Sequence, residues 1–334
     1  FKIIGSSRKN VDGKNIVTGK PLYGLDYKED KMLIAMIVHS PSFGTQLKET
    51  DVSAVRSMPG IKDAFYIDAY TEKMERQWCD VAAFPKLLVI VGKSTWEVMQ
   101  AKKSVKSETE PIKASSRKID LFGTTETVVT PAGLENTVSH KEQMTSISSQ
   151  KVKTVRKDGS PEAMFAKATT VLEKSYSCPF LSHSTMEPMN FFADVKEDSA
   201  ILTGPVQTPS FLEKSISDRL GLPIEKVEVK MTRMGGGFGR RLYCHFGVEA
   251  AVISQRMKAP VKLIYTREDD MTDGVYRPAY HATYRAAFNE NKNLTAFHVK
   301  AGGIPESPLS ANRFPAGTID HYLAEEFTIP SNIS

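Results

Sequence analysis

Short apolar runs separated by turn residues mark the first third of the chain. The runs at 33–38 and 87–91 are continuous in Ile, Leu, Val and Met, which predicts buried strands. Two helices are predicted at 54–58, closed by a Pro-Gly pair, and at 96–105, where a Ser-Thr pair supplies the N-cap. We therefore interpret residues 1–108 as one small α+β domain.

The pattern is lost in the next segment. Residues 109–157 are rich in Ser, Thr and Lys, contain few large apolar side chains, and keep neither a period of two nor one of 3.6. We expect this segment to be a linker or a surface excursion, and the sequence assigns it no function.

Regular patterning returns in residues 158–334. Pro161 in a first turn predicts a helix that ends near residue 167, and a strand is expected at 170–176. A hairpin is expected across 191–202. The next helix begins at Thr208-Pro209 and is closed by Gly221, and its apolar side chains share one face: Leu212, Ile216 and Leu220.

A glycine-rich loop follows the strand expected at 227–231. Its residues are Gly235, Gly236, Gly237, Phe238 and Gly239, and helical spacing over 246–257 and a strand at 261–265 come after it. Strand, loop, helix and strand in this order predict a βαβ-like unit with the loop at the start of the helix.

Composition and charge narrow the function classes. Of 334 residues, 40% are apolar and 25% charged, which is typical of a globular protein, and a net charge of +5 with dispersed basic residues argues against nucleic acid as a partner. Neither a membrane-spanning run nor a signal peptide is recognisable, and a chain that opens with Phe1 is expected to be part of something longer.

The three cysteines give no cofactor signature. Cys79, Cys178 and Cys244 are widely spaced, so we expect neither a disulfide framework nor an iron–sulfur site, and any cluster should lie on another chain. All three are expected to be small, buried or half-buried apolar residues.

The glycine loop carries the chemistry. Glycines at a helix N-terminus leave backbone N–H groups open to a ligand, and Arg240 and Arg241 could add charge-assisted bonds to phosphate. The loop matches neither the phosphate-binding motif that ends in Gly-Lys-Ser/Thr nor the dinucleotide motif, which needs glycine at Arg240. On spacing alone, an anion cradle and a tight turn without a ligand are equally supported.

Four blocks in order resemble one family. Residues 183–190 (HSTMEPMN), 205–209 (PVQTP), 234–241 (MGGGFGRR) and 260–271 (PVKLIYTREDDM) are similar to the large, molybdenum-binding subunit of xanthine-oxidase-type hydroxylases, in the isoquinoline 1-oxidoreductase β-subunit subgroup. Residues 11–26 resemble the opening of that family's a/b hammerhead domain. The resemblance implies an α+β fold, with a hammerhead domain at 1–108 and the first part of the molybdenum cofactor-binding domain at 158–334.

The resemblance also implies a reaction and partners. Its members hold molybdenum through a pyranopterin, here expected as molybdopterin cytosine dinucleotide, and hydroxylate an N-heteroaromatic ring or an aldehyde with oxygen from water. Electrons leave through a small subunit with [2Fe-2S] clusters. The protein orients a cofactor that brings its own dithiolene ligands, so no cluster of protein metal ligands is expected.

Individual roles follow from the same resemblance. Gln207 corresponds to the family glutamine that hydrogen-bonds the molybdenum centre, and Phe238 with Gly239 to the pair whose backbone approaches the oxo ligand. The remaining loop residues and Arg240 would line the pterin and its phosphate. Cofactor-binding residues are therefore expected to be Gln207, Gly235, Gly236, Gly237, Phe238, Gly239 and Arg240.

Other polar residues are expected to be structural. His183 and Glu187 sit four apart, but the nearby prolines favour a loop, with Glu187 held in hydrogen bonds or facing the cofactor. Residues 266–270 are interpreted as a polar turn, and Arg277 as structural. Cys244 and its neighbours stand where many relatives have an acidic residue. The family's general base is a glutamate near the end of the large subunit, expected outside this chain, so the fragment alone should be inactive.

Two other function classes stay open. The chain could be a non-catalytic anion- or nucleotide-binding module that keeps the fold, or a pure interaction domain, which leaves Gln207 and the glycine loop unexplained. Analogy favours the periplasm or cell envelope over the cytoplasm. We also expect self-association through apolar surface that the missing part would cover.

Overall fold

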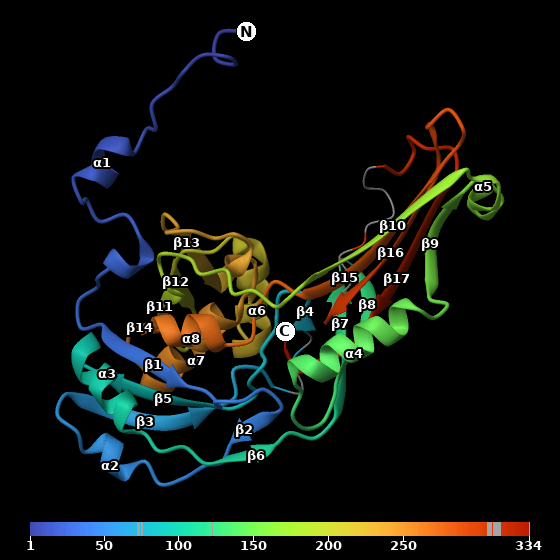
Figure 1. The fold of residues 1–334 in the computed structure, drawn as a ribbon. Coiled ribbons are helices and arrows are strands. Elements are labelled where there is room, and N and C mark those ends of the chain that lie inside the picture. The colour runs from blue at the N-terminus through green and yellow to red at the C-terminus, as the bar shows by residue number, and fades with distance from the viewer. Residues whose placement is uncertain (72–73, 75, 122, 306–308, 310–314, 334) are drawn as a thin grey trace.

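A twisted seven-stranded sheet forms the body of the protein. The computed structural model describes residues 1–71, 74, 76–121, 123–305, 309 and 315–333 (Figure 1). In sheet order the strands are β13 (Val227–Met231), β12 (Ala200–Gly204), β11 (Asn190–Val195), β14 (Val261–Ile264), β1 (Leu33–Val38), β5 (Leu87–Gly92) and β3 (Ile61–Ile67). Strands from the first third of the chain and strands between residues 190 and 264 thus share one layer.

The middle of this sheet is buried on both faces. In β5, Leu88 and Ile90 belong to one core cluster, and Val89 and Val91 belong to the other. Burial on both faces explains why the sequence there is a continuous apolar run and not an alternating one. Helices α2 (Ser53–Arg56) and α3 (Thr95–Ser104) lie on the first face, and α6 (Pro209–Leu220) and α7 (His245–Met257) on the second.

The two predicted domains, residues 1–108 and 158–334, contribute strands to the same sheet. Strand β1 pairs in parallel with β14, where Leu33 lies opposite Val261. Residues 1–108 therefore complete their sheet with a strand from the third predicted segment, and their core is continuous with it.

A second sheet projects to one side of the body (Figure 1). Its order is β10 (Thr170–Cys178), β15 (Ala279–Phe288), β16 (Leu294–Ile304), β17 (Tyr322–Thr328) and β9 (Lys153–Asp158). Helices α4 (Thr137–Ser148) and α5 (Pro161–Lys167) pack against β16. Strand β10 is an edge strand, and all nine of its residues are exposed.

Residues 109–157 are more regular than their composition suggested. They contain β6 (Thr109–Pro111), which pairs with β2 (Thr45–Leu47), and a hairpin of β7 (Ser115–Leu121) and β8 (Thr124–Thr130) beside β4 (Arg76–Gln77). They also contain α4 and most of β9. The interpretation as a linker or surface excursion did not include the β7–β8 hairpin, because β8 is mostly exposed and so imposes no apolar alternation on the sequence.

Short helical turns complete the chain: α1 (Gly13–Val17), η1 (Gly24–Asp26), η2 (Ile224–Lys226), η3 (Arg240–Leu242) and α8 (Arg267–Thr272). Within the described ranges, no helix combines the length and the apolar character needed to cross a bilayer.

Candidate cofactor-binding site

The glycine loop connects β13 to the turn η3 at one end of the seven-stranded sheet. The sequence predicted that it would open an α-helix directly, but η3 follows the loop, and α7 begins only at His245. Gly239, at φ +96°, turns the chain into η3. The dipole of α7 therefore does not begin at the loop, and any anion binding there must rest on the loop's own N–H groups.

Those N–H groups are available to a ligand. Among the residues that the structure describes, none accepts a hydrogen bond from the backbone N–H of Gly236, Gly237, Phe238 or Gly239. Gly236 and Phe238 both have positive φ, +104° and +55°, and the Phe238 side chain is 64% exposed. A non-glycine residue held in this region is strained, which is common where a backbone is shaped for a ligand.

Gln207 lies beside this row of N–H groups. Its own backbone N–H donates to the carbonyl of Arg241 at 2.9 Å, which fixes the segment after β12 against η3. A Cβ atom placed on Gly237 would lie 2.7 Å from Oε1 of Gln207. The structure therefore places Gln207 against the glycine loop at Gly237, and their roles in binding a cofactor stay a prediction.

Glu187 anchors the start of the loop. The segment around it is not helical, as predicted, and its side chain is buried. Oε2 accepts a hydrogen bond from the N–H of Gly235 at 2.7 Å, and Oε1 accepts from the N–H of Leu25 at 3.0 Å and from Nδ2 of Asn190 at 3.1 Å. The expectation that Glu187 is held in hydrogen bonds is confirmed.

The two arginines after the loop do not point at a ligand. Arg241 is fully buried and donates to the carbonyls of Gly236 at 2.8 Å and of Glu187 at 2.7 Å. Arg240 is 1% exposed, and its guanidinium is enclosed by the carboxylates of Asp270 and Asp273. The predicted contact of Arg240 with a phosphate is therefore corrected: its donors are committed to buried ion pairs that support the loop from beneath.

A domain match decides the family of this region. Residues 140–302, which contain Gln207 and the loop, match the molybdopterin cofactor-binding domain. This part of the chain is a molybdopterin cofactor-binding domain. The match supports the predicted relationship to molybdenum-binding subunits of the xanthine oxidase type, which the relatives below confirm.

Relatives and solved structures agree with the domain match. The chain is 26% identical to the membrane-bound aldehyde dehydrogenase of Gluconacetobacter polyoxogenes, whose name specifies pyrroloquinoline quinone, over 98% of the chain and 40% of that protein. It is 26% identical to isoquinoline 1-oxidoreductase subunit beta of Brevundimonas diminuta, over 87% of the chain and 34% of that protein. The chain thus spans well under half of these relatives.

Two crystal structures share the fold. Quinoline 2-oxidoreductase from Pseudomonas putida 86 aligns with a TM-score of 0.69 at 17% identity, over 98% of this chain and 45% of that one. Aldehyde oxidoreductase from Desulfovibrio desulfuricans aligns with a TM-score of 0.73 at 17% identity, over 99% and 39%. The predicted α+β fold class is confirmed.

Beneath the loop, the cofactor-binding domain buries a cluster of ionisable groups. Residues 266–270, predicted as a polar turn, instead begin the helix α8: Thr266 and Asp269 form its capping box, and Asp270 is buried against Arg240. His245 lies 3.1 Å from Asp273 through Nε2, and burial lowers its pKa. His245 is thus one of these buried groups. The acidic residues of the cluster are Asp270 in α8 and Asp273, the residue after α8.

Glu249, one turn further along α7, adds an acid to this cluster. Its Oε2 accepts a hydrogen bond from the hydroxyl of Tyr265 at 2.6 Å. Burial raises the pKa of Glu249 to about 8, and the bond from Tyr265 acts in the opposite direction. Glu249 is therefore protonated over much of the physiological range.

Two residues touch the far end of the loop. Nε2 of His183 lies 3.6 Å from the position that a Cβ on Gly239 would take, and Arg277 donates to the carbonyl of Phe238 at 3.2 Å. Burial, followed by the charges of Arg240 and Arg277, lowers the pKa of His183 to about 4. His183 is thus a neutral ring beside the loop, a placement that its spacing in the sequence did not signal.

The cysteines depart from expectation in two ways. Cys178, at the end of β10, is exposed and not buried. Cys79 and Cys244 are buried as predicted, but they are neighbours, with Sγ atoms 3.3 Å apart.

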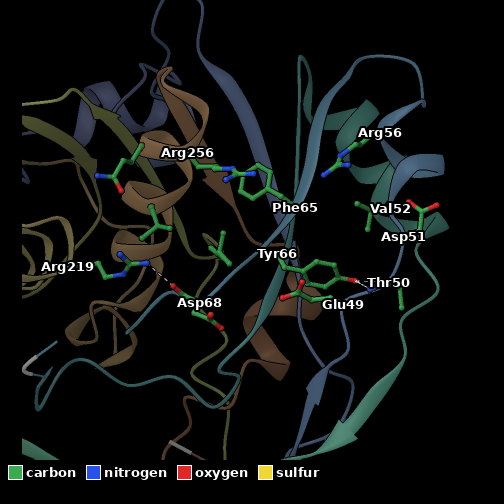
Figure 2. A pocket seen from close by; sticks show the side chains of 13 residues that line it. Glu49, Thr50, Asp51, Val52, Arg56, Phe65, Tyr66, Asp68, Arg219 and Arg256 are labelled. Atoms are coloured by element: carbon green, nitrogen blue, oxygen red, sulfur yellow. Dashed lines mark hydrogen bonds between the residues drawn. The ribbon is translucent and has the colours of Figure 1, made fainter. Parts of the chain in front are cut away.

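A separate cavity of about 620 Å³ lies away from the glycine loop (Figure 2). Three arginines line it, but each has a partner: Arg56 pairs with Asp63, Arg219 donates to the carbonyl of Asp68, and Arg256 lies over the ring of Phe65. None of its lining residues belongs to the predicted site, so the candidate site remains the open surface of the glycine loop.

Proposed function

We propose that this protein binds a molybdenum pyranopterin, as molybdopterin cytosine dinucleotide, on the glycine loop and Gln207. The complete enzyme would hydroxylate a carbon of an N-heteroaromatic ring or of an aldehyde, with water as the source of oxygen. The names of the relatives, which include an isoquinoline oxidoreductase and an aldehyde dehydrogenase, support these two substrate classes.

One observation carries the proposal: four successive backbone N–H groups, for which no described residue is an acceptor, lie beside the exposed side chain of Gln207. Such a row suits a ligand rich in oxygen acceptors, because each free N–H can donate to it. Half-buried glycines keep the surface open, since a Cβ on Gly237 would meet Gln207. The residues present therefore fit a pterin with its phosphate and oxygen ligands.

Each residue then has a binding or orienting task. The amide of Gln207 would donate to an oxygen of the molybdenum centre, the N–H groups of Gly236 and Gly237 would hold the pterin, and the backbone of Phe238 and Gly239 would face the oxo ligand. Glu187 and Arg241 fix the loop's position from the protein side. When bound, the cofactor supplies the two-electron redox chemistry, and the protein supplies orientation and hydrogen bonds.

We further propose a small [2Fe-2S] subunit as electron acceptor and a location in the periplasm or cell envelope. The naming of relatives as "subunit beta" and "large molybdopterin subunit" supports a partner chain, and the membrane-bound relative supports the location. The cysteine spacing of this chain, which lacks a cluster motif, agrees with clusters held elsewhere.

The test is cofactor analysis of the complete subunit, purified with its partner from its native host. We expect molybdenum and cytosine nucleotide near one per subunit, both lost in Gln207→Leu. Gln255→Leu is a matched control, because Gln255 is also an exposed glutamine but lies on α7 at the separate cavity. A well-folded full-length subunit with neither molybdenum nor nucleotide would instead identify a non-catalytic binding module.

A further inference from the structure

Two buried thiols meet at the junction between the N-terminal third and the cofactor-binding domain. Cys79 follows β4, and Cys244 is the residue before α7, 165 positions later. The backbone N–H of Cys244 donates to the carbonyl of Cys79 at 2.9 Å, and the two Sγ atoms are 3.3 Å apart. Their exposed fractions are 0% and 1%.

This geometry is compatible with a covalent bridge. A disulfide needs Cα atoms about 4.4–6.8 Å apart and Cβ atoms that face each other, with an S–S bond of about 2.05 Å. A backbone hydrogen bond between the two residues already holds their main chains side by side. Because the sulfur atoms already touch, small side-chain rotations close the remaining gap without moving the sheet or α7.

We propose that Cys79 and Cys244 form a disulfide when the protein folds in an oxidising compartment. The bond would join the segment after β4 to Cys244, the residue that precedes α7. Cys244 lies only a few positions after the glycine loop and η3. The bond would therefore brace the loop's C-terminal side against the N-terminal third of the chain. This inference depends on the cysteine geometry and not on the identity of the cofactor.

The oxidant is an external disulfide, either of a small thiol or of a thiol oxidoreductase. One cysteine thiolate attacks it and releases one thiol, and the second thiolate then displaces the other thiol as the Cys79–Cys244 bond forms. Two electrons pass to the external disulfide, and the two cysteine protons end on the released thiols. Since both residues are buried, this exchange takes place before packing is complete.

Burial explains why the reduced pair would be inert once folded. Contact with Cys79 and burial raise the pKa of the Cys244 thiol, so the reactive thiolate is scarce in the native state. The redox conditions during folding therefore decide whether the bridge forms. In the folded protein, reduction or oxidation of the pair requires local unfolding around the two buried cysteines.

A metal ion is the competing occupant, because Asp80 offers a carboxylate close to both thiols. The number of ligands disfavours it. Among the described residues only Cys79, Asp80 and Cys244 could bind one ion together, one ligand short of a structural zinc site, and Oδ2 of Asp80 already accepts a hydrogen bond from the N–H of Gln77 at 3.0 Å. A disulfide needs only the two sulfur atoms.

Mass spectrometry tests the proposal directly. The chain is refolded with a mixture of oxidised and reduced glutathione, then unfolded in N-ethylmaleimide. We expect one alkylated cysteine of the three, and a proteolytic fragment in which the peptides of Cys79 and Cys244 are linked until a reductant is added. Oxidation should also raise the Tm by at least about 5 °C, because the bridge closes a long loop.

Matched variants separate the pair from the third thiol. Cys178→Ser should leave the linked fragment intact, whereas Cys79→Ser and Cys244→Ser should abolish it. Three alkylated cysteines in the unsubstituted protein at every glutathione ratio would overturn the proposal. So would stoichiometric zinc or copper that protects both thiols from alkylation and is lost in Cys79→Ser. Peptide mapping of the unsubstituted chain decides the matter even if a serine variant does not fold.

Discussion

The carboxylate of Glu187 accepts a hydrogen bond from the backbone N–H of Gly235, with Oε2 and N 2.7 Å apart. The same oxygen lies 3.3 Å from Nη2 of Arg241, so one buried side chain fixes both ends of the glycine loop. The buried arginine in turn binds the carbonyl of Gly236. The position of the loop is therefore set by a residue 48 positions earlier, and this pair can be tested separately from any cofactor.

Glu187→Ala should destabilise the fold strongly. The change leaves the guanidinium of Arg241 buried without its carboxylate, and removing one partner of a buried ion pair costs about 3–5 kcal/mol. We expect a fall of this order in the free energy of unfolding, measured by urea denaturation. Glu197→Ala, in an exposed turn, is the control and should change it by less than about 0.5 kcal/mol. Equal denaturation midpoints for both variants would contradict the anchoring role.

Arg240→Lys tests whether Arg240 supports the loop from beneath. Lysine keeps the charge but cannot bridge Asp270 and Asp273 with a planar fork, so we expect a loss of about 2–4 kcal/mol in the free energy of unfolding. Arg267→Lys affects the same Asp270 from a half-exposed position and should cost less than about 1 kcal/mol. If Arg240→Lys were as stable as the parent and lost only nucleotide, the phosphate contact predicted from the sequence would be restored.

Local signals predicted the fold better than they predicted the contacts. The strands at 33–38 and 87–91 were predictable because burial on both faces makes them continuously apolar. The β7–β8 hairpin was missed because β8 is mostly exposed and carries no apolar alternation. Resemblance to the family placed Gln207 beside the loop. No local pattern indicates the meeting of Cys79 with Cys244, because only tertiary packing brings them together.

Glu249 should contribute a loss of stability as pH rises. The lowered pKa of His183 acts in the opposite direction up to about pH 6.5, so the contribution of Glu249 has to be measured as a difference between a variant and the parent. The pKa of Glu249 is raised from 4.5 to about 8 by burial, so between these values the folded chain holds a proton that the unfolded chain has released. The native state binds more protons in that window. The stabilisation that protonated Glu249 contributes is thus complete below pH 4.5 and is lost as pH rises through the folded pKa of about 8. Between these values its contribution to the free energy of unfolding falls by up to about 1.4 kcal/mol per pH unit.

Glu249→Gln should flatten that slope. Glutamine cannot ionise, and its carbonyl can still accept the hydrogen bond from Tyr265. We expect the difference in free energy of unfolding between the variant and the parent, measured between pH 5 and 8, to move in favour of the variant as pH rises. Glu197→Gln, which is exposed, should keep the parent's slope. Parallel curves for Glu249→Gln and the parent would show that Glu249 titrates normally.

Gly237→Ala should separate cofactor binding from folding. The new Cβ would lie 2.7 Å from Oε1 of Gln207, and because that side chain is exposed it can swing away at little cost. We expect the free energy of unfolding to change by less than about 1 kcal/mol, while the molybdenum and nucleotide contents of the complete subunit fall at least tenfold. Gly13→Ala is the matched control, since its Cβ would make only an ordinary contact at 3.7 Å with Asn10. A Gly237→Ala subunit that retained full molybdenum would show that neither the open glycine surface nor the position of Gln207 is needed to hold the cofactor.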